Sequence, residues 1–90
     1  MKITLVKKIL ADGSPCKKCG DVLQKLEESG HIAKIDEILI ADERDPSSEG
    51  MQIAKALDVN RAPFFVIDRE SDNPVVYTVY FKLVKEVFDK

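Results

Sequence analysis

Two cysteines separated by two residues are the side chains in this 90-residue chain whose spacing most directly suggests chemistry. Cys16 and Cys19 enclose Lys17 and Lys18. A C-x-x-C pair occurs in half of a zinc site, in iron–sulfur sites and in redox dithiols. As a redox pair, the first cysteine attacks a disulfide as its thiolate and the second resolves the mixed disulfide that forms.

The residues around the pair favour a thiolate at Cys16. Pro15 closes a loop and cannot continue a strand, so we expect a helix to begin at or near Cys16. A helix N-terminus carries roughly +0.5 elementary charge and free N–H groups, which stabilise an anion. Lys17 and Lys18 add positive charge beside it. We therefore expect Cys16 to attack and Cys19, less exposed, to resolve.

A second motif follows further along the chain, at Arg61-Ala62-Pro63-Phe64-Phe65. A dithiol after one expected strand, and a proline just before another, resemble in order and spacing the thioredoxin/glutaredoxin superfamily. The resemblance implies that the Ala62–Pro63 peptide bond is cis, that it lies opposite the dithiol and that this backbone pairs with the substrate. It also makes Arg61 a candidate contact for an anionic substrate group.

The expected helices and strands are consistent with this resemblance. Hydrophobic periodicity and turn residues predict, in order, strand 3–10, helix 16–30, strand 35–41, a helix opening at 45–49 with Asp45 or Ser47 as its cap, strand 64–67, strand 75–78 after the polar turn 68–74, and helix 83–88. The order βαβαββα predicts an α/β protein, a single domain over residues 1–90, with a four-stranded mixed sheet flanked by three helices. This is the minimal thioredoxin-like order.

The sequence also predicts local features of two of the expected strands. The continuous apolar run Ile38-Leu39-Ile40 predicts a strand that is buried on both faces. Lys7 and Lys8 are adjacent in the first strand, where neighbouring side chains point to opposite faces. Either that strand ends early, or a bulge turns it, or one lysine extends toward the cysteines.

The chain departs from both branches of the superfamily it resembles. Glutaredoxins carry a glycine pair where residues 77–82 here have none, so we do not expect this site to recognise glutathione. Thioredoxins have a tryptophan before the first cysteine and a buried acid, where this chain has Pro15 and Leu10. Asp12 lies on a polar loop and is a poor substitute for that acid. His31, the only histidine, is expected on a surface loop without a role.

The formal net charge of −2 gives no general attraction to nucleic acid or to an anionic membrane. No apolar run is long enough to span a bilayer, and no secretory leader is evident, so we expect a cytoplasmic protein. Charge is uneven: residues 1–18 hold five lysines and one acid, whereas residues 36–50 hold six acids and one arginine. These are either two solvated faces or a basic rim around the cysteines that favours acidic partners.

The leading hypothesis is a thiol–disulfide oxidoreductase that needs no cofactor besides its own dithiol. Its partners would be a disulfide-containing protein or a small sulfur compound, with electrons from a separate thiol or protein reductase, and it would act as a monomer. One alternative is a thioredoxin-like module that binds a peptide or partner without turnover. Another is a metal or iron–sulfur carrier in which two C-x-x-C pairs meet across a dimer.

Overall fold

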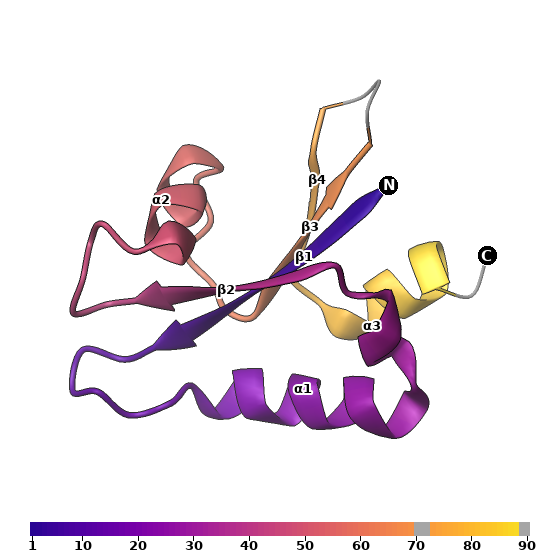
Figure 1. The fold of residues 1–90 in the computed structure, drawn as a ribbon, viewed down its shortest axis with the longest axis horizontal. Coiled ribbons are helices and arrows are strands. Elements are labelled where there is room, and N and C mark those ends of the chain that lie inside the picture. The colour runs from indigo at the N-terminus through magenta and orange to yellow at the C-terminus, as the bar shows by residue number, and fades with distance from the viewer. Residues whose placement is uncertain (70–72, 89–90) are drawn as a thin grey trace.

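The computed structural model describes residues 1–69 and 73–88, a mixed α/β fold with four strands and three α-helices in those ranges (Figure 1). The elements are β1 (Lys2–Ile9), α1 (Lys17–Ser29), β2 (Glu37–Asp42), α2 (Glu49–Ala56), β3 (Phe64–Asp68), β4 (Val75–Tyr77) and α3 (Tyr80–Leu83). A 3-10 helix, η1 (His31–Lys34), follows α1, and a π-helical turn, η2 (Val84–Phe88), continues α3. The expected element order is confirmed. Residues 70–72 of the expected 68–74 turn lie outside the described residues.

The sheet has the strand order β2-β1-β3-β4. β1 is parallel to β2 and antiparallel to β3, and β3 is antiparallel to β4. The first connection, through α1, is therefore a parallel βαβ unit. The second, through α2, crosses back over β1, so that β3 lies on the opposite side of β1 from β2. The mixed sheet expected from the sequence is confirmed, with β1 at its centre.

The position of β2 at the edge of the sheet corrects one expectation. Ile38 and Ile40 are 43% and 41% exposed, so this strand is not buried on both faces. Only Leu39 and Ala41, which point to the α2 side, pack into a core. An uninterrupted apolar run suits a central strand, but pairing here occurs with β1 alone, and α1 leaves the Ile38 and Ile40 face uncovered.

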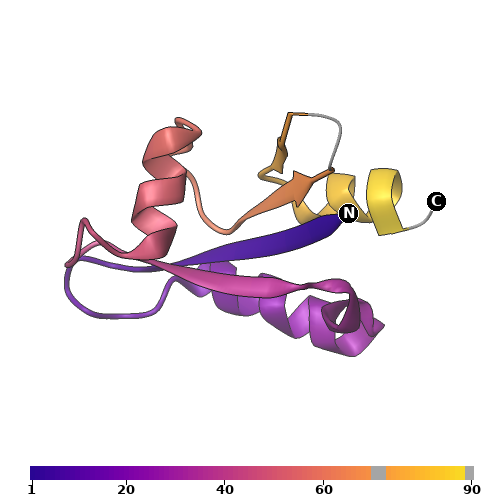
Figure 2. The same cartoon turned by 45° about the horizontal axis from the view of Figure 1, so that its top comes forward.

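The two faces of the sheet carry separate apolar cores, with α1 on one face and α2 on the other (Figure 2). The α1 and α3 side buries Ile3, Leu5, Leu26, Phe65, Ile67, Leu83 and Phe88. The α2 side buries Val6, Ala41 and Phe64, with partly buried side chains from α2. Alternation along β1 and β3 divides these residues between the faces, as a two-residue strand period requires.

Helix α2 starts later than the sequence suggests, and it lies against the backbone of β2. Its cap is Ser48, because Asp45 and Ser47 are engaged in a turn in which the Asp45 carboxylate accepts the Ser47 amide and hydroxyl protons. Gly50 is buried in the first turn, where a Cβ would overlap the backbone of Ile40 and Ala41. A glycine at this position is what allows the close approach of α2 to β2.

Candidate dithiol site

Cys16 is the N-cap residue of α1, so the helix begins where the sequence predicted. Its Sγ accepts the backbone N–H of Cys19 at 3.3 Å, and its own N–H donates to the Lys8 carbonyl at 3.2 Å. Both cysteines are free thiols, and Cys16 is half-buried whereas Cys19 is buried. The first thiol is therefore held at a helix N-terminus, next to the backbone N–H groups of the first turn.

The loop between β1 and α1 places Cys16 by folding back on the end of β1. Pro15 forms an isolated antiparallel bridge with Ile9. Gly13 adopts a φ of 87°, a left-handed conformation that favours glycine. Asp12 accepts the amide and hydroxyl protons of Ser14, and these hydrogen bonds lower the pKa of its carboxyl. Asp12 thus stabilises the loop through Ser14.

Cys19 is only 5% exposed, and its thiol is held against β1. The Lys8 amide donates to its Sγ at 3.3 Å. Burial raises the pKa of the Cys19 thiol to about 12, and the hydrogen bond and charge of Cys16 act in the same direction. The hydrogen bond from the Lys8 amide and the charge of Lys7 act in the opposite direction and lower the pKa of Cys19. The pair is therefore asymmetric, with one accessible thiol and one protonated, sheltered thiol.

Lys7 and Lys8 resolve the choice that the sequence left open. Strand β1 continues through both residues to Ile9, so it neither ends early nor needs a bulge to accommodate them. Lys7 points to the α1 face, where its charge acts on Cys19. Lys8 points to the α2 face and forms an ion pair with Glu43 at 3.4 Å. The first two alternatives are therefore excluded, and Lys7 lies on the face of the sheet that α1 covers.

The Ala62–Pro63 peptide bond is cis and faces the dithiol, as predicted. The Ala62 carbonyl oxygen lies 4.0 Å from the Sγ of Cys16, although the two residues are far apart in sequence. Pro63 is buried and Ala62 half-buried. The structure therefore brings together both motifs that the sequence analysis singled out.

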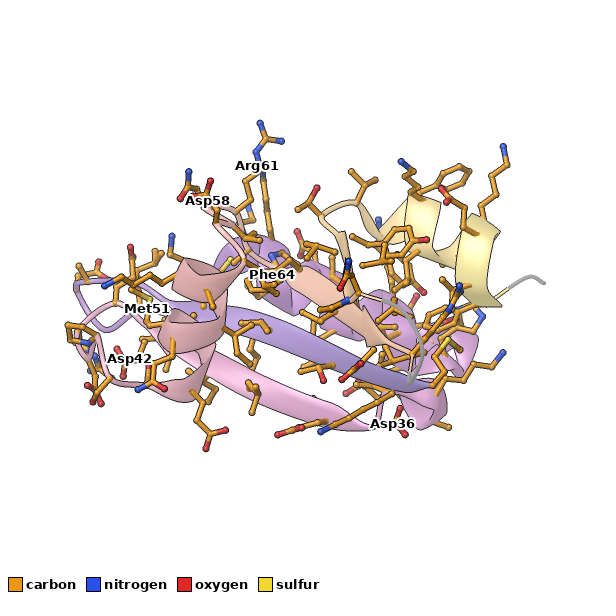
Figure 3. All side chains as sticks on the ribbon, turned by 90° about the horizontal axis from the view of Figure 1, so that it is seen from above. Asp36, Asp42, Met51, Asp58, Arg61 and Phe64 are labelled. Atoms are coloured by element: carbon orange, nitrogen blue, oxygen red, sulfur yellow. The ribbon has the colours of Figure 1, made fainter. Side chains whose placement is uncertain are left out.

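Two surface hollows flank the place where the Ala62 carbonyl faces Cys16. The dithiol-side hollow, about 920 Å³, is lined by Lys18, Asp21, Val22, Lys25, Arg61, Ala62, Pro63, Thr78, Val79, Tyr80 and Phe81. The α2-side hollow, about 510 Å³, is lined by Lys8, Ala41, Glu43, Pro46, Met51, Ala54, Lys55, Asp58, Val59, Asn60, Arg61, Ala62 and Phe64. Arg61 and Ala62 belong to both. Figure 3 shows Arg61 extending outward beside Asp58, with Met51 and Phe64 on the α2 side.

The remaining predicted site residues lie around these hollows. Lys17 and Lys18 are exposed in the first turn of α1, and Lys18 lines the dithiol-side hollow. Arg61 is exposed and lines both hollows. Sequence reasoning missed Lys25, which the helical period of α1 would have placed on the same side as Lys18. Phe81, which also lines the dithiol-side hollow, is 76% exposed.

His31, expected on a surface loop, opens the 3-10 helix η1 after α1. Its ring is half-buried, with Nδ1 3.2 Å from the Tyr80 hydroxyl and the ring centroid 4.6 Å from that of Phe88. Tyr80 also lies 3.3 Å from the Ser29 hydroxyl and lines the dithiol-side hollow. These contacts join the end of α1 to α3, and no local sequence pattern signals a contact across so large a separation.

Within residues 1–69 and 73–88, no three His, Cys, Asp or Glu side chains gather in a way that would hold a metal ion. None of the helices in this part of the chain combines the length and apolar character needed to cross a bilayer. Comparison with protein-family models, with curated proteins and with solved structures found no match to this chain.

Proposed function

We propose that this protein is a thiol–disulfide oxidoreductase of the thioredoxin-like type, with Cys16 as nucleophile and Cys19 as resolving thiol. The observation that carries the proposal is the asymmetry of the pair. Cys16 is accessible and receives an amide proton at a helix start, whereas Cys19 is buried, with its pKa raised to about 12 mainly by burial. A structural or idle pair of cysteines has no need for this division.

The proposed reaction transfers two electrons from the dithiol to a disulfide. The Cys16 thiolate attacks one sulfur of the substrate disulfide, forms a mixed disulfide and expels the other substrate sulfur as a thiolate, which takes up a proton. Cys19 then loses its proton and attacks Cys16 Sγ. The Cys16–Cys19 disulfide forms, the second substrate sulfur leaves as a thiol, and the protein is oxidised by two electrons.

Three further features support the thioredoxin-like assignment. The sheet has a central first strand with one parallel and one antiparallel neighbour, and the dithiol opens the helix that follows that strand. The Ala62–Pro63 segment faces the dithiol and lies between two hollows. Lys17 and Lys18 add positive charge to the same helix start.

A single-turnover experiment tests this proposal. The reduced protein, freed of reductant, is mixed with one equivalent of a neutral peptide disulfide, and the products are followed by mass spectrometry. We expect the wild type to release two peptide thiols and gain the Cys16–Cys19 disulfide. Cys19→Ser should release one thiol and retain the other peptide half on Cys16, and Cys16→Ser should do neither. A wild type that leaves the disulfide intact would make the protein a binding module or a metal carrier.

A further inference from the structure

We propose that the two hollows form one groove that receives an extended, acidic segment of a partner protein, with the partner's disulfide placed over Ala62. This inference deepens the proposed function by naming the chemistry of the substrate. Its starting point is geometric: the hollows share Arg61 and Ala62, and the Ala62 carbonyl lies 4.0 Å from Cys16 Sγ.

The shared residues determine how a partner chain would lie. A disulfide sulfur that reaches Cys16 brings its backbone beside Ala62. From that point the partner continues in one direction into the dithiol-side hollow and in the other into the α2-side hollow. An extended segment spans about 3.3 Å per residue, so several residues on each side of the cysteine meet the groove. A small disulfide fills only its centre.

The charged residues of the dithiol-side hollow indicate that the partner segment is acidic. The dithiol-side hollow presents Lys18, Lys25 and Arg61 against the single acid Asp21. None of these three cations forms an ion pair with another residue of the described ranges 1–69 and 73–88. The chain as a whole has a formal net charge of −2, so this positive surface is local. Complementary charge across an interface selects the partner and accelerates the encounter.

The α2-side hollow also contains cations, but acidic side chains accompany them, so it has no comparable excess of positive charge. Lys8 is paired with Glu43, and Lys55 is accompanied by Asp58. Its floor includes the apolar side chains of Met51 and Phe64. We therefore place the acidic residues of the partner on the dithiol side of its cysteine.

Exposed apolar side chains add a second requirement on that side. Val79 is 53% exposed and Phe81 is 76% exposed, and both line the dithiol-side hollow. Large apolar side chains left in water beside a reactive thiol gain free energy when a partner covers them. Aromatic residues are enriched among those that contribute most to interfaces. The partner segment thus combines carboxylates with at least one apolar residue.

The test compares two peptide disulfides of equal length that share one apolar residue and differ only in carrying two glutamates or two lysines near the cysteine. In single-turnover assays at low salt, we expect the acidic peptide to react about tenfold faster, with the ratio falling as salt is raised. Lys25→Gln and Arg61→Gln should each lower the ratio about threefold. Lys85→Gln, an exposed lysine on η2, is the matched control that should leave it unchanged.

The apolar contribution is tested with Phe81→Gln, which should slow both peptides, whereas Val75→Thr, a control at an exposed apolar residue of β4, should slow neither. Equal rates for the acidic and basic peptides, while a neutral peptide disulfide is still reduced, would overturn the inference and leave the proposed function intact. Failure to reduce any of the three peptides would overturn both.

Discussion

At the scale of single residues, the two cysteines differ in environment far more than in kind. Two of the causes that raise the pKa of Cys19 are its hydrogen bond and its electrostatic interaction with Cys16. In the proposed mixed disulfide, Cys16 has no ionisable thiol, so both interactions are removed. The Lys7 charge and the Lys8 amide, which lower the pKa of Cys19, remain. Under the proposed function, we therefore expect capture of a substrate to make Cys19 easier to deprotonate.

The first prediction concerns the relative reactivity of the two thiols. At pH 7.5, iodoacetamide should alkylate Cys16 in the Cys19→Ser variant at least about a hundredfold faster than Cys19 in Cys16→Ser, because only the thiolate reacts and burial keeps Cys19 protonated. Burial is the largest cause of the raised pKa of Cys19, so the shift survives the loss of Cys16. Mass spectrometry against time measures both rates. Similar rates would contradict the assignment of the two roles.

The second prediction concerns stability in alkali. Below the ordinary cysteine pKa of 9.0, Cys19 is protonated in both the folded and the unfolded chain, so its contribution to stability is complete. Between 9.0 and about 12 the unfolded chain ionises while the folded state still holds the proton. Stability from this group is lost across that window. The free energy of unfolding of the reduced wild type should therefore fall more steeply with pH than that of Cys19→Ala.

Urea titrations under reductant, repeated at intervals from pH 8 to pH 11, measure this difference. The variant retains every other group that titrates in alkali, including the lysines and tyrosines, so subtraction isolates Cys19. Parallel pH profiles for the two proteins would show that Cys19 ionises equally easily in the folded and unfolded chains.

At the scale of elements, local rules explain what the sequence could predict. Helix α1 is capped by Cys16 at its start and by Gly30, with a left-handed φ of 81°, at its end. Proline and glycine signals in the sequence therefore predicted both ends of this helix. The edge position of β2 could not be predicted, because an apolar run does not specify how many neighbouring strands it pairs with. The same holds for Lys7, since only the placement of α1 decides which lysine lies on the face of the sheet that α1 covers.

The third prediction follows from the packing of α2 on β2. Gly50→Ala should lower the free energy of unfolding by about 2–3 kcal/mol, because the new methyl group overlaps the backbone of Ile40 and Ala41, which cannot move aside as a side chain would. Urea or thermal unfolding measures the loss. Since α2 also lines one hollow, reduction of a peptide disulfide should be impaired in the same variant.

Gly20 provides the matched control for this prediction. It lies in α1, where a Cβ meets no atom of the described residues within 4 Å. Gly20→Ala should therefore raise stability by about 0.5–1 kcal/mol through helix propensity alone. If Gly50→Ala behaved like Gly20→Ala, the close contact between α2 and β2 would not exist.

At the scale of the whole molecule, the dithiol and the N-terminus lie toward opposite ends. The loop that leads into α1 is at one end of the fold, and the start of β1 and η2 are at the other (Figure 1). Both hollows are lined by Arg61 and Ala62, so they meet at this segment. The cis Ala62–Pro63 bond and its position were predicted by resemblance to a family, whereas the groove depends on contacts between distant segments that no sequence pattern shows.

The last prediction concerns glutathione as electron donor. A glutathione site of the glutaredoxin type uses backbone N–H donors at a glycine-rich turn. Without side chains at that turn, the carboxylate of the tripeptide can approach closely. Here the turn between β4 and α3 carries Val79, and Phe81 follows it, both exposed and bulky. Glutathione also spans too few residues to contact both hollows, and exposed charges such as Lys25 and Arg61 alone contribute little affinity.

We therefore expect glutathione to regenerate the reduced protein slowly and without saturation, whereas a small dithiol at equal thiol concentration regenerates it efficiently. The measurement follows disappearance of the Cys16–Cys19 disulfide by quenched alkylation and mass spectrometry. Phe81→Gly with Val79→Gly opens the turn and should improve the glutathione rate if bulk is the obstacle, while the rate with the dithiol stays constant. Saturable, efficient turnover of the wild type with glutathione would show that Val79 and Phe81 do not exclude the tripeptide.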